Sequence, residues 1–107
     1  MTTPDRRLEP RKSADIRAVV LAGGFEMGAR IVDQSTGGLK IVLDRAMALK
    51  GRITVIDILR GVAIEADAVW VKGAEAGLKR RGEASLRGLT PSRLAEARAA
   101  WLRVGGR

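Results

Sequence analysis

The sequence predicts a mainly β fold, a small antiparallel β-barrel followed by a C-terminal α-helix. Short segments in which every second residue is apolar recur along the chain, and this period is typical of strands with one buried face. Glycine-bearing turns separate these segments, which gives five or six strands in about 65 residues with no helical crossover between them. Because a sheet this small and twisted usually closes on itself, a barrel is expected.

The first three strands are expected in the N-terminal half of the chain. Residues 16–21 are apolar except for Arg17 and partly β-branched, and the two glycines at 23–24 can adopt the positive φ angles of a tight hairpin turn. Residues 25–32 alternate between apolar and other side chains, as a strand with one buried face does. A turn-rich break at 33–38 precedes the same alternation in residues 39–44.

The rest of the sheet is expected to be a strand pair and a short last strand. Residues 53–59 and 62–71 are rich in isoleucine, valine and alanine, and they flank a turn at 60–61. Residues 76–79 complete the sheet as a short strand.

A helix is expected at the end of the chain. Thr90 is a suitable cap, Pro91 suits the first helical position, and the glycines at 105–106 should end the helix. The apolar residues at helical spacing are Leu94, Ala97, Trp101 and Val104. We expect Trp101 to pack on the barrel and the arginines of the polar side, Arg93, Arg98 and Arg103, to be solvated. The alternative is a helix that docks on an acidic partner.

The composition favours binding over catalysis. Cysteine and histidine are both absent, which excludes a disulfide, a Cys/His zinc site, a thiol nucleophile and a Ser-His-Asp triad. The sequence therefore predicts a protein that is not an enzyme and that carries no cofactor or metal.

The net charge of +8 is concentrated at the two ends of the chain. Residues 1–12 form a basic segment that we expect to be a flexible arm, residues 13–82 are expected to form the barrel, and residues 83–107 the basic helix and tail. Such charge attracts phosphates, acidic proteins or anionic surfaces. No apolar run approaches the roughly 20 residues of a membrane span, and no signal peptide is recognisable, so a cytoplasmic location is expected.

Two short motifs stand out when they are read together. Arg7 and Arg11 lie four residues apart beside Arg6 and Lys12, and residues 33–38 read Asp-Gln-Ser-Thr-Gly-Gly. This pair resembles the signature of the PilZ domain family, RxxxR followed about two dozen residues later by [D/N]xSxxG, on a matching strand pattern. The resemblance implies a six-stranded barrel that acts as a receptor for cyclic di-GMP, with an unidentified downstream protein as partner and a monomer or ligand-dependent dimer as its state.

The resemblance also implies the residues of the site. Arg7 and Arg11 should grip the ligand, while Arg6 and Lys12 add contacts to its phosphates. The barrel side of the site should be lined by Asp33, Ser35 and Gly38. Trp70 is a candidate contact for the bases, but core packing is the favoured interpretation because a large aromatic residue on a strand normally packs inside.

These residue types suit a cyclic dinucleotide that contains guanine. Arginine donates bidentate hydrogen bonds to phosphate oxygens and to the guanine Hoogsteen edge, and its guanidinium stacks on purines. Asp33 can accept from the guanine N1–H and amino groups, Ser35 offers a hydroxyl, and Gly38 allows a close backbone approach. Ordering the arm on the ligand would provide a disorder-to-order switch.

One position departs from the family pattern. Arg80 follows Gly77-Leu78-Lys79 where the family usually has phenylalanine, and we expect Trp101 to fill the resulting gap. Two alternative functions remain: a small basic barrel that binds RNA or single-stranded DNA, and a PilZ-like interaction module without nucleotide binding. The scarcity of aromatic residues for base stacking makes nucleic acid the weaker alternative.

Overall fold

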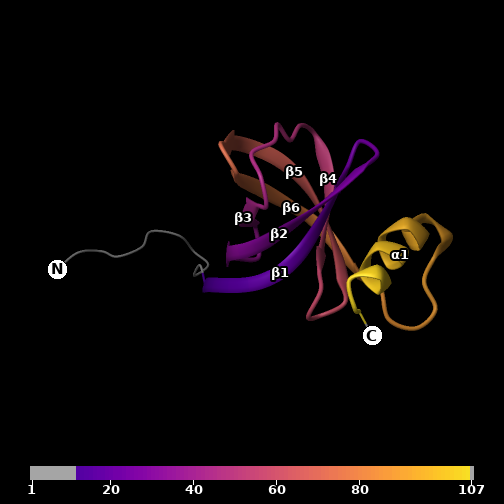
Figure 1. Ribbon diagram of the computed structural model, residues 1–107. Helices are drawn as coiled ribbons and strands as arrows, with labels where there is room; N and C mark the ends of the chain where they lie inside the picture. The colour runs from indigo at the N-terminus through magenta and orange to yellow at the C-terminus, as the bar shows by residue number, and fades with distance from the viewer. Residues whose placement is uncertain (1–11, 107) are drawn as a thin grey trace.

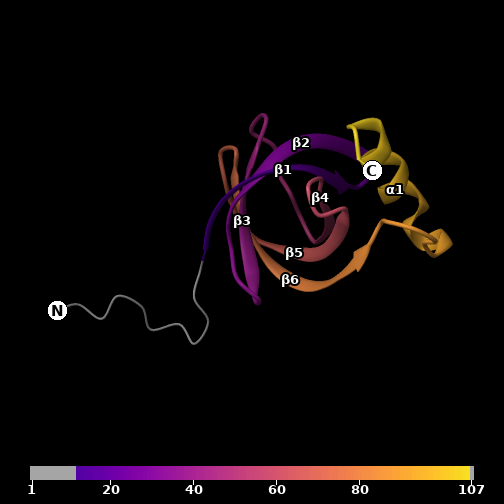
Figure 2. The same cartoon turned by 90° about the horizontal axis from the view of Figure 1, so that it is seen from below.

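The computed structural model describes residues 12–106 as a closed antiparallel barrel with one helix packed on its outer face (Figures 1 and 2). The strands are β1 (Lys12–Ala22), β2 (Phe25–Gln34), β3 (Gly38–Leu43), β4 (Arg52–Asp57), β5 (Val62–Lys72) and β6 (Glu75–Ser85). They pair in the order β1-β2-β3-β6-β5-β4, and pairing of β4 with β1 closes the barrel. The predicted mainly β, six-stranded barrel with a C-terminal helix is confirmed.

The barrel interior is built from the alternating apolar residues that the sequence analysis singled out. Six inward residues of β2 and β3 are buried and belong to one cluster: Met27, Ala29, Ile31, Leu39, Ile41 and Leu43. The hairpin between β1 and β2 turns at Gly23 and Gly24, whose φ angles are +54° and +88°. Both glycines therefore supply the left-handed backbone conformation that this tight turn requires.

A second apolar cluster lies between the outer face of the barrel and the C-terminal helix, α1 (Ala95–Arg103). Trp101 is 1% exposed in this cluster, and its Nε1 donates a hydrogen bond to the Ile58 carbonyl oxygen (3.0 Å). The prediction that Trp101 packs on the barrel is confirmed. The expectation that it fills the gap beside Arg80 is wrong, because Trp101 packs outside the barrel wall whereas Leu78 belongs to the interior cluster.

Several strand boundaries differ from the prediction, and the largest differences are at the start of β1 and the end of β6. β1 begins at Lys12 rather than residue 16, because its backbone continues to pair with the end of β2. β6 continues to Ser85 rather than residue 79, because it stays paired with β5 along its whole length. β4 ends at Asp57, two residues earlier than predicted, where the turn that contains Gly61 (φ +66°) begins.

The helix also begins differently from the prediction. Pro91 has extended dihedral angles (φ −61°, ψ 151°) and precedes a short 3₁₀ helix, η1 (Ser92–Leu94), so Thr90 is not the cap. α1 then runs to Arg103, and Gly105 follows with φ +96°. α1 lies at the opposite end of the barrel from the start of β1 (Figure 1).

Candidate functional site

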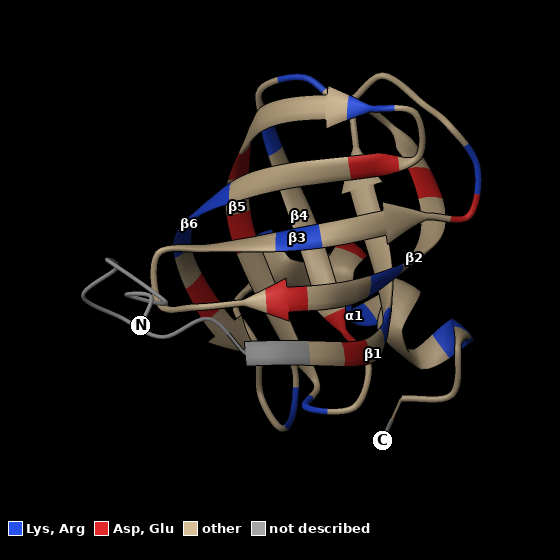
Figure 3. Cartoon of the chain, turned by 90° about the vertical axis from the view of Figure 1, so that its left-hand side faces the viewer, with Lys and Arg blue, Asp and Glu red and all other residues tan. Residues whose placement is uncertain are grey.

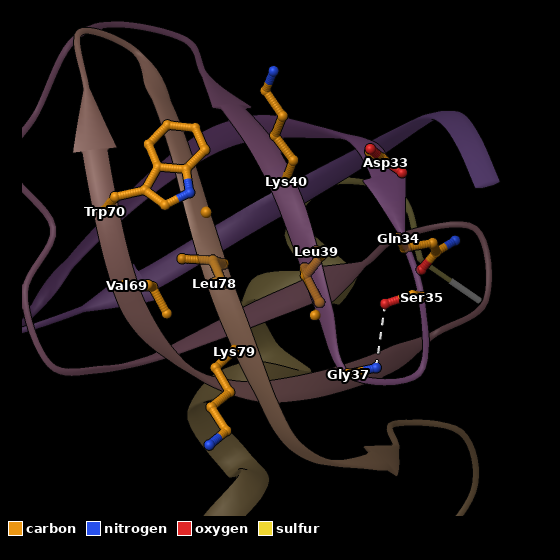
Figure 4. Close-up of a pocket in the computed structure, with 12 residues that line it drawn as sticks. Asp33, Gln34, Ser35, Gly37, Leu39, Lys40, Val69, Trp70, Leu78 and Lys79 are labelled. Atoms are coloured by element: carbon orange, nitrogen blue, oxygen red, sulfur yellow. Dashed lines mark hydrogen bonds between the residues drawn. The ribbon is translucent and has the colours of Figure 1, made fainter. Parts of the chain in front are cut away.

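A pocket of about 360 Å³ lies on the outer surface of the barrel, over β2, β3, β5 and β6 (Figure 4). It brings together Asp33, Ser35, Gly38 and Trp70, four of the residues proposed for the site from the sequence. Its other lining residues are Gln34, Gly37, Leu39, Lys40, Val69, Gly77, Leu78 and Lys79. The pocket is therefore formed by segments that are far apart in the chain.

Strand register explains how these segments meet. Asp33 of β2 pairs with Lys40 of β3, Lys40 pairs with Gly77 of β6, and Gly77 pairs with Trp70 of β5. The four residues thus form one row across the sheet. Because side chains alternate along a strand and Leu39 is buried inside, this row lies on the outward face.

The turn at residues 33–38 is held by its own hydrogen bonds. The Ser35 amide donates to the Gly38 carbonyl (2.9 Å), and the Gly37 amide donates to the Ser35 Oγ (3.3 Å). Gly38 also meets a steric requirement, because a Cβ at this position would lie 2.7 Å from the Leu78 carbonyl oxygen. Only glycine allows β3 to approach β6 this closely.

Trp70 is not a core residue. The residue is 44% exposed, so the interpretation of Trp70 as core packing is wrong. The register between β5 and β6 shifts between Ala68 and Trp70, so Val69 is an extra residue at a bulge. The indole lies on Gly77, where a Cβ would overlap its Nε1 and Cε2 atoms. Because residue 77 has no side chain, the Trp70 indole can pack directly against its backbone.

Gly77→Ala is expected to displace the Trp70 indole, because the added methyl group occupies the space of the ring. We expect a change in the indole N–H resonance of Trp70 but not of Trp101, and a stability loss of about 1–3 kcal/mol from overpacking. Gly82→Ala is the matched control in the same strand, since a Cβ there meets nothing within 4 Å. An unchanged Trp70 resonance in Gly77→Ala would contradict the packing of the indole on Gly77.

Two lysines that the sequence analysis did not assign to the site flank the pocket. Lys40 lies 3.4 Å from Glu75, and Lys79 forms no ion pair among residues 12–106. Figure 4 shows the two side chains extending in opposite directions. Because Leu39 points inside, the alternation of side chains along β3 predicts that Lys40 points outside. The position of Lys40 next to Asp33, however, depends on the pairing of β2 with β3.

Asp67, the acidic residue that pairs with Lys79, forms hydrogen bonds with two arginines. Asp67 pairs with Lys79 across the sheet, but its carboxylate accepts hydrogen bonds from the Nε atoms of Arg52 (2.8 Å) and Arg81 (2.6 Å). The hydrogen bond from Arg52 is the main cause that lowers the pKa of the Asp67 carboxyl. Asp67 therefore has two arginine partners and forms no ion pair with Lys79 in the described part of the chain.

Charge on the rest of the barrel is mixed. On the face shown in Figure 3, basic and acidic segments are interspersed along the strands. No group of three or more acidic side chains in residues 12–106 could hold a metal ion. In the same part of the chain, no helix is both long and apolar enough to cross a membrane.

The arginines of the first motif, Arg6, Arg7 and Arg11, lie outside the described residues. The backbone of Lys12 is described, and it pairs with Gln34, while Ser13 pairs with Asp33. The described part of β1 therefore begins directly beside the 33–38 turn.

A family model described as the PilZ domain matches residues 5–90, a range that includes both motifs and all six strands. No curated protein matches the chain.

Proposed function

Because the chain belongs to the PilZ domain family, a known family of cyclic di-GMP-binding domains, we propose that it is a receptor for cyclic di-GMP. The observation that carries this proposal is the pocket that brings Asp33, Ser35, Gly38 and Trp70 together beside the start of β1. PilZ domains are binding domains rather than a catalytic family. The proposed activity is accordingly recognition without a chemical step.

The described residues can recognise a guanine base. The Asp33 carboxylate accepts hydrogen bonds, which suits the N1–H and amino group of guanine. The exposed face of Trp70 offers a stacking surface, and base–aromatic stacking is worth about 1–3 kcal/mol. The pocket volume of about 360 Å³ is at the lower end for ligand sites, so it accommodates part of a cyclic dinucleotide. The remainder of the ligand would need to be covered by other residues.

The arm is the proposed cover. Arg11 adjoins Lys12 in the chain, and the Cα atom of Arg7 can lie at most about 18 Å from that of Lys12. Both arginines can therefore reach a ligand in the pocket, where they would bind its phosphates and guanine edges together with Arg6 and Lys12. Lys79 would add a cation on the barrel side.

Closure of the arm would provide the signal. Ordering residues 6–12 costs on the order of 7–14 kcal/mol of backbone entropy. Each charge-assisted hydrogen bond contributes roughly 1.5–3 kcal/mol, so several are needed before the arm closes. Ligand binding would then order the arm and change the surface that a downstream protein meets.

Titration of the protein with three ligands at matched salt tests this proposal. Cyclic di-GMP should bind saturably. Cyclic di-AMP should bind at least about tenfold more weakly, because adenine lacks the N1–H and the 2-amino group from which Asp33 would accept hydrogen bonds. A mixed single-stranded oligonucleotide should bind weakly and lose affinity steeply as salt rises.

Equal affinity for the two cyclic dinucleotides would contradict the proposed role of Asp33. Tighter binding of the oligonucleotide would favour the nucleic-acid alternative. Absence of binding by all three ligands would favour an interaction module that has kept the fold without the nucleotide.

A further inference from the structure

Arg80 occupies an inward position of the barrel wall. It pairs with Ala66, which is buried, and it follows the buried Leu78 by two residues along β6. Its side chain is only 15% exposed. A guanidinium this far from water needs hydrogen-bonding partners, because burial of an unpaired charge is costly. The partners of Arg80 therefore indicate why a cation stands at a position where the family usually has phenylalanine.

A bulge supplies the first partner. Gly82 pairs with Glu65 and Arg80 with Ala66, so Arg81 is an extra residue in β6. Residues three apart in a regular strand point to opposite faces, but the bulge brings Arg80 and Glu83 to the same face. The Arg80 Nη1 donates to the Glu83 Oε1 at 2.8 Å.

Further charges anchor Glu83. Its Oε2 accepts a hydrogen bond from the Arg60 Nη2 (2.9 Å), and the Arg60 Nη1 lies 4.0 Å from the Oδ2 of Asp57. Asp57 is fully buried, and its Oδ1 accepts from the Arg60 backbone amide (2.9 Å). The four side chains alternate in sign and sum to zero charge. This chain of ion pairs fixes the orientation of the Arg80 guanidinium.

The other contacts of Arg80 reach the 33–38 turn at two points. The Arg80 Nη2 donates to the Gln34 Oε1 at 3.4 Å, and its backbone amide donates to the Gly37 carbonyl at 3.0 Å. Gln34 and Gly37 lie on either side of Ser35. Arg80 therefore forms hydrogen bonds with the turn on both sides of Ser35. The same turn places Asp33 and Ser35 at the pocket.

We propose that Arg80 is a positioning residue for the 33–38 turn: its guanidinium, held by Glu83, fixes Gln34 and thereby presets the turn for ligand. A turn that is already ordered loses less entropy when it binds, so its rigidity raises affinity. This inference rests on the proposed function only where ligand affinity is concerned. The order of the turn in the free protein is a separate consequence.

The test compares Arg80→Leu with Arg81→Leu, which removes the same charge one residue away without touching the turn. In the free protein, amide hydrogen exchange of Ser35 should rise at least about tenfold in Arg80→Leu and less than about twofold in Arg81→Leu. The amide of Val55, in the buried part of β4, should report any global destabilisation. Arg80→Leu should also weaken cyclic di-GMP binding at least about fivefold relative to Arg81→Leu.

Arg80→Lys is the second variant, and it remains informative if Arg80→Leu does not fold. Lysine keeps the charge but lacks the planar fork that donates to two partners at once, so exchange at Ser35 should still rise at least about threefold. Unchanged exchange at Ser35 in a folded variant, or an equal rise at Ser35 and Val55, would overturn the inference. Equal affinities of the Arg80→Leu and Arg81→Leu variants would also overturn it. If the wild-type protein does not bind the nucleotide, the proposed function fails and exchange alone decides the role of Arg80.

Discussion

Trp101→Ala is expected to lower the free energy of unfolding by about 3–5 kcal/mol, because the substitution leaves a large cavity in the cluster between the barrel and α1. Trp101 is the largest fully buried side chain of the described residues. The substitution also removes the hydrogen bond to Ile58 and the contact with the Arg87 guanidinium, which lies 5.3 Å from the ring centroid. Urea denaturation followed by circular dichroism measures the loss.

The neighbouring residue supplies the control for this experiment. Leu102 is 49% exposed, so Leu102→Ala should change the unfolding free energy by less than about 1 kcal/mol. A loss below about 1.5 kcal/mol in Trp101→Ala would mean that the outer cluster contributes little to stability. Such a small loss would make α1 an appendage of a barrel that is stable without it.

The double variant Arg7→Ala/Arg11→Ala is expected to bind cyclic di-GMP at least about 100-fold more weakly than the wild-type protein. Each arginine is proposed to contribute a charge-assisted contact worth more than about 1.4 kcal/mol, which corresponds to tenfold in affinity. Isothermal titration calorimetry measures the loss. Circular dichroism should hardly change, because both residues precede β1 in the chain.

A second double variant, which removes two charges at the helical end of the chain, distinguishes direct contact with the ligand from long-range electrostatic attraction. Arg93→Ala/Arg103→Ala removes the same charge from the helical end of the chain, where Arg93 lies in η1 and Arg103 is the last residue of α1. The affinity of this variant should fall less than about threefold relative to the wild-type protein. This difference in affinity from the wild type should vanish near 1 M salt, where the screening length is roughly 3 Å. Equal losses in the two double variants would overturn the assignment of the arm to the site.

The strands that could be predicted well are those whose signal is local. β2 and β3 follow strict alternation, and the turn before β2 contains two glycines with positive φ, so their sequence alone specifies them. The extension of β6 could not be found in this way. Its polar end, residues 80–85, is a strand because β5 provides a hydrogen-bonding partner, and the bulge at Arg81 disrupts any alternation.

The same division applies to the candidate site. Asp33, Ser35 and Gly38 are visible in the sequence because they belong to one short motif. Lys79 cannot be predicted from a local motif, because only the pairing of β6 with β3 brings it to the pocket. The usual behaviour of tryptophan predicts a core position for Trp70. The residue that changes this outcome, Gly77, is its pairing partner on the adjacent strand β6.

The seating of Trp70 on Gly77 has an evolutionary consequence. A mutation that gives residue 77 a side chain is incompatible with the indole in its present position. Such a mutation would become tolerable after residue 70 had changed to a smaller side chain. A change of residue 70 to a smaller side chain, in contrast, is possible while residue 77 is still glycine. The two positions should therefore vary as a pair among descendants of this protein, and the order of substitution should favour loss of the tryptophan first.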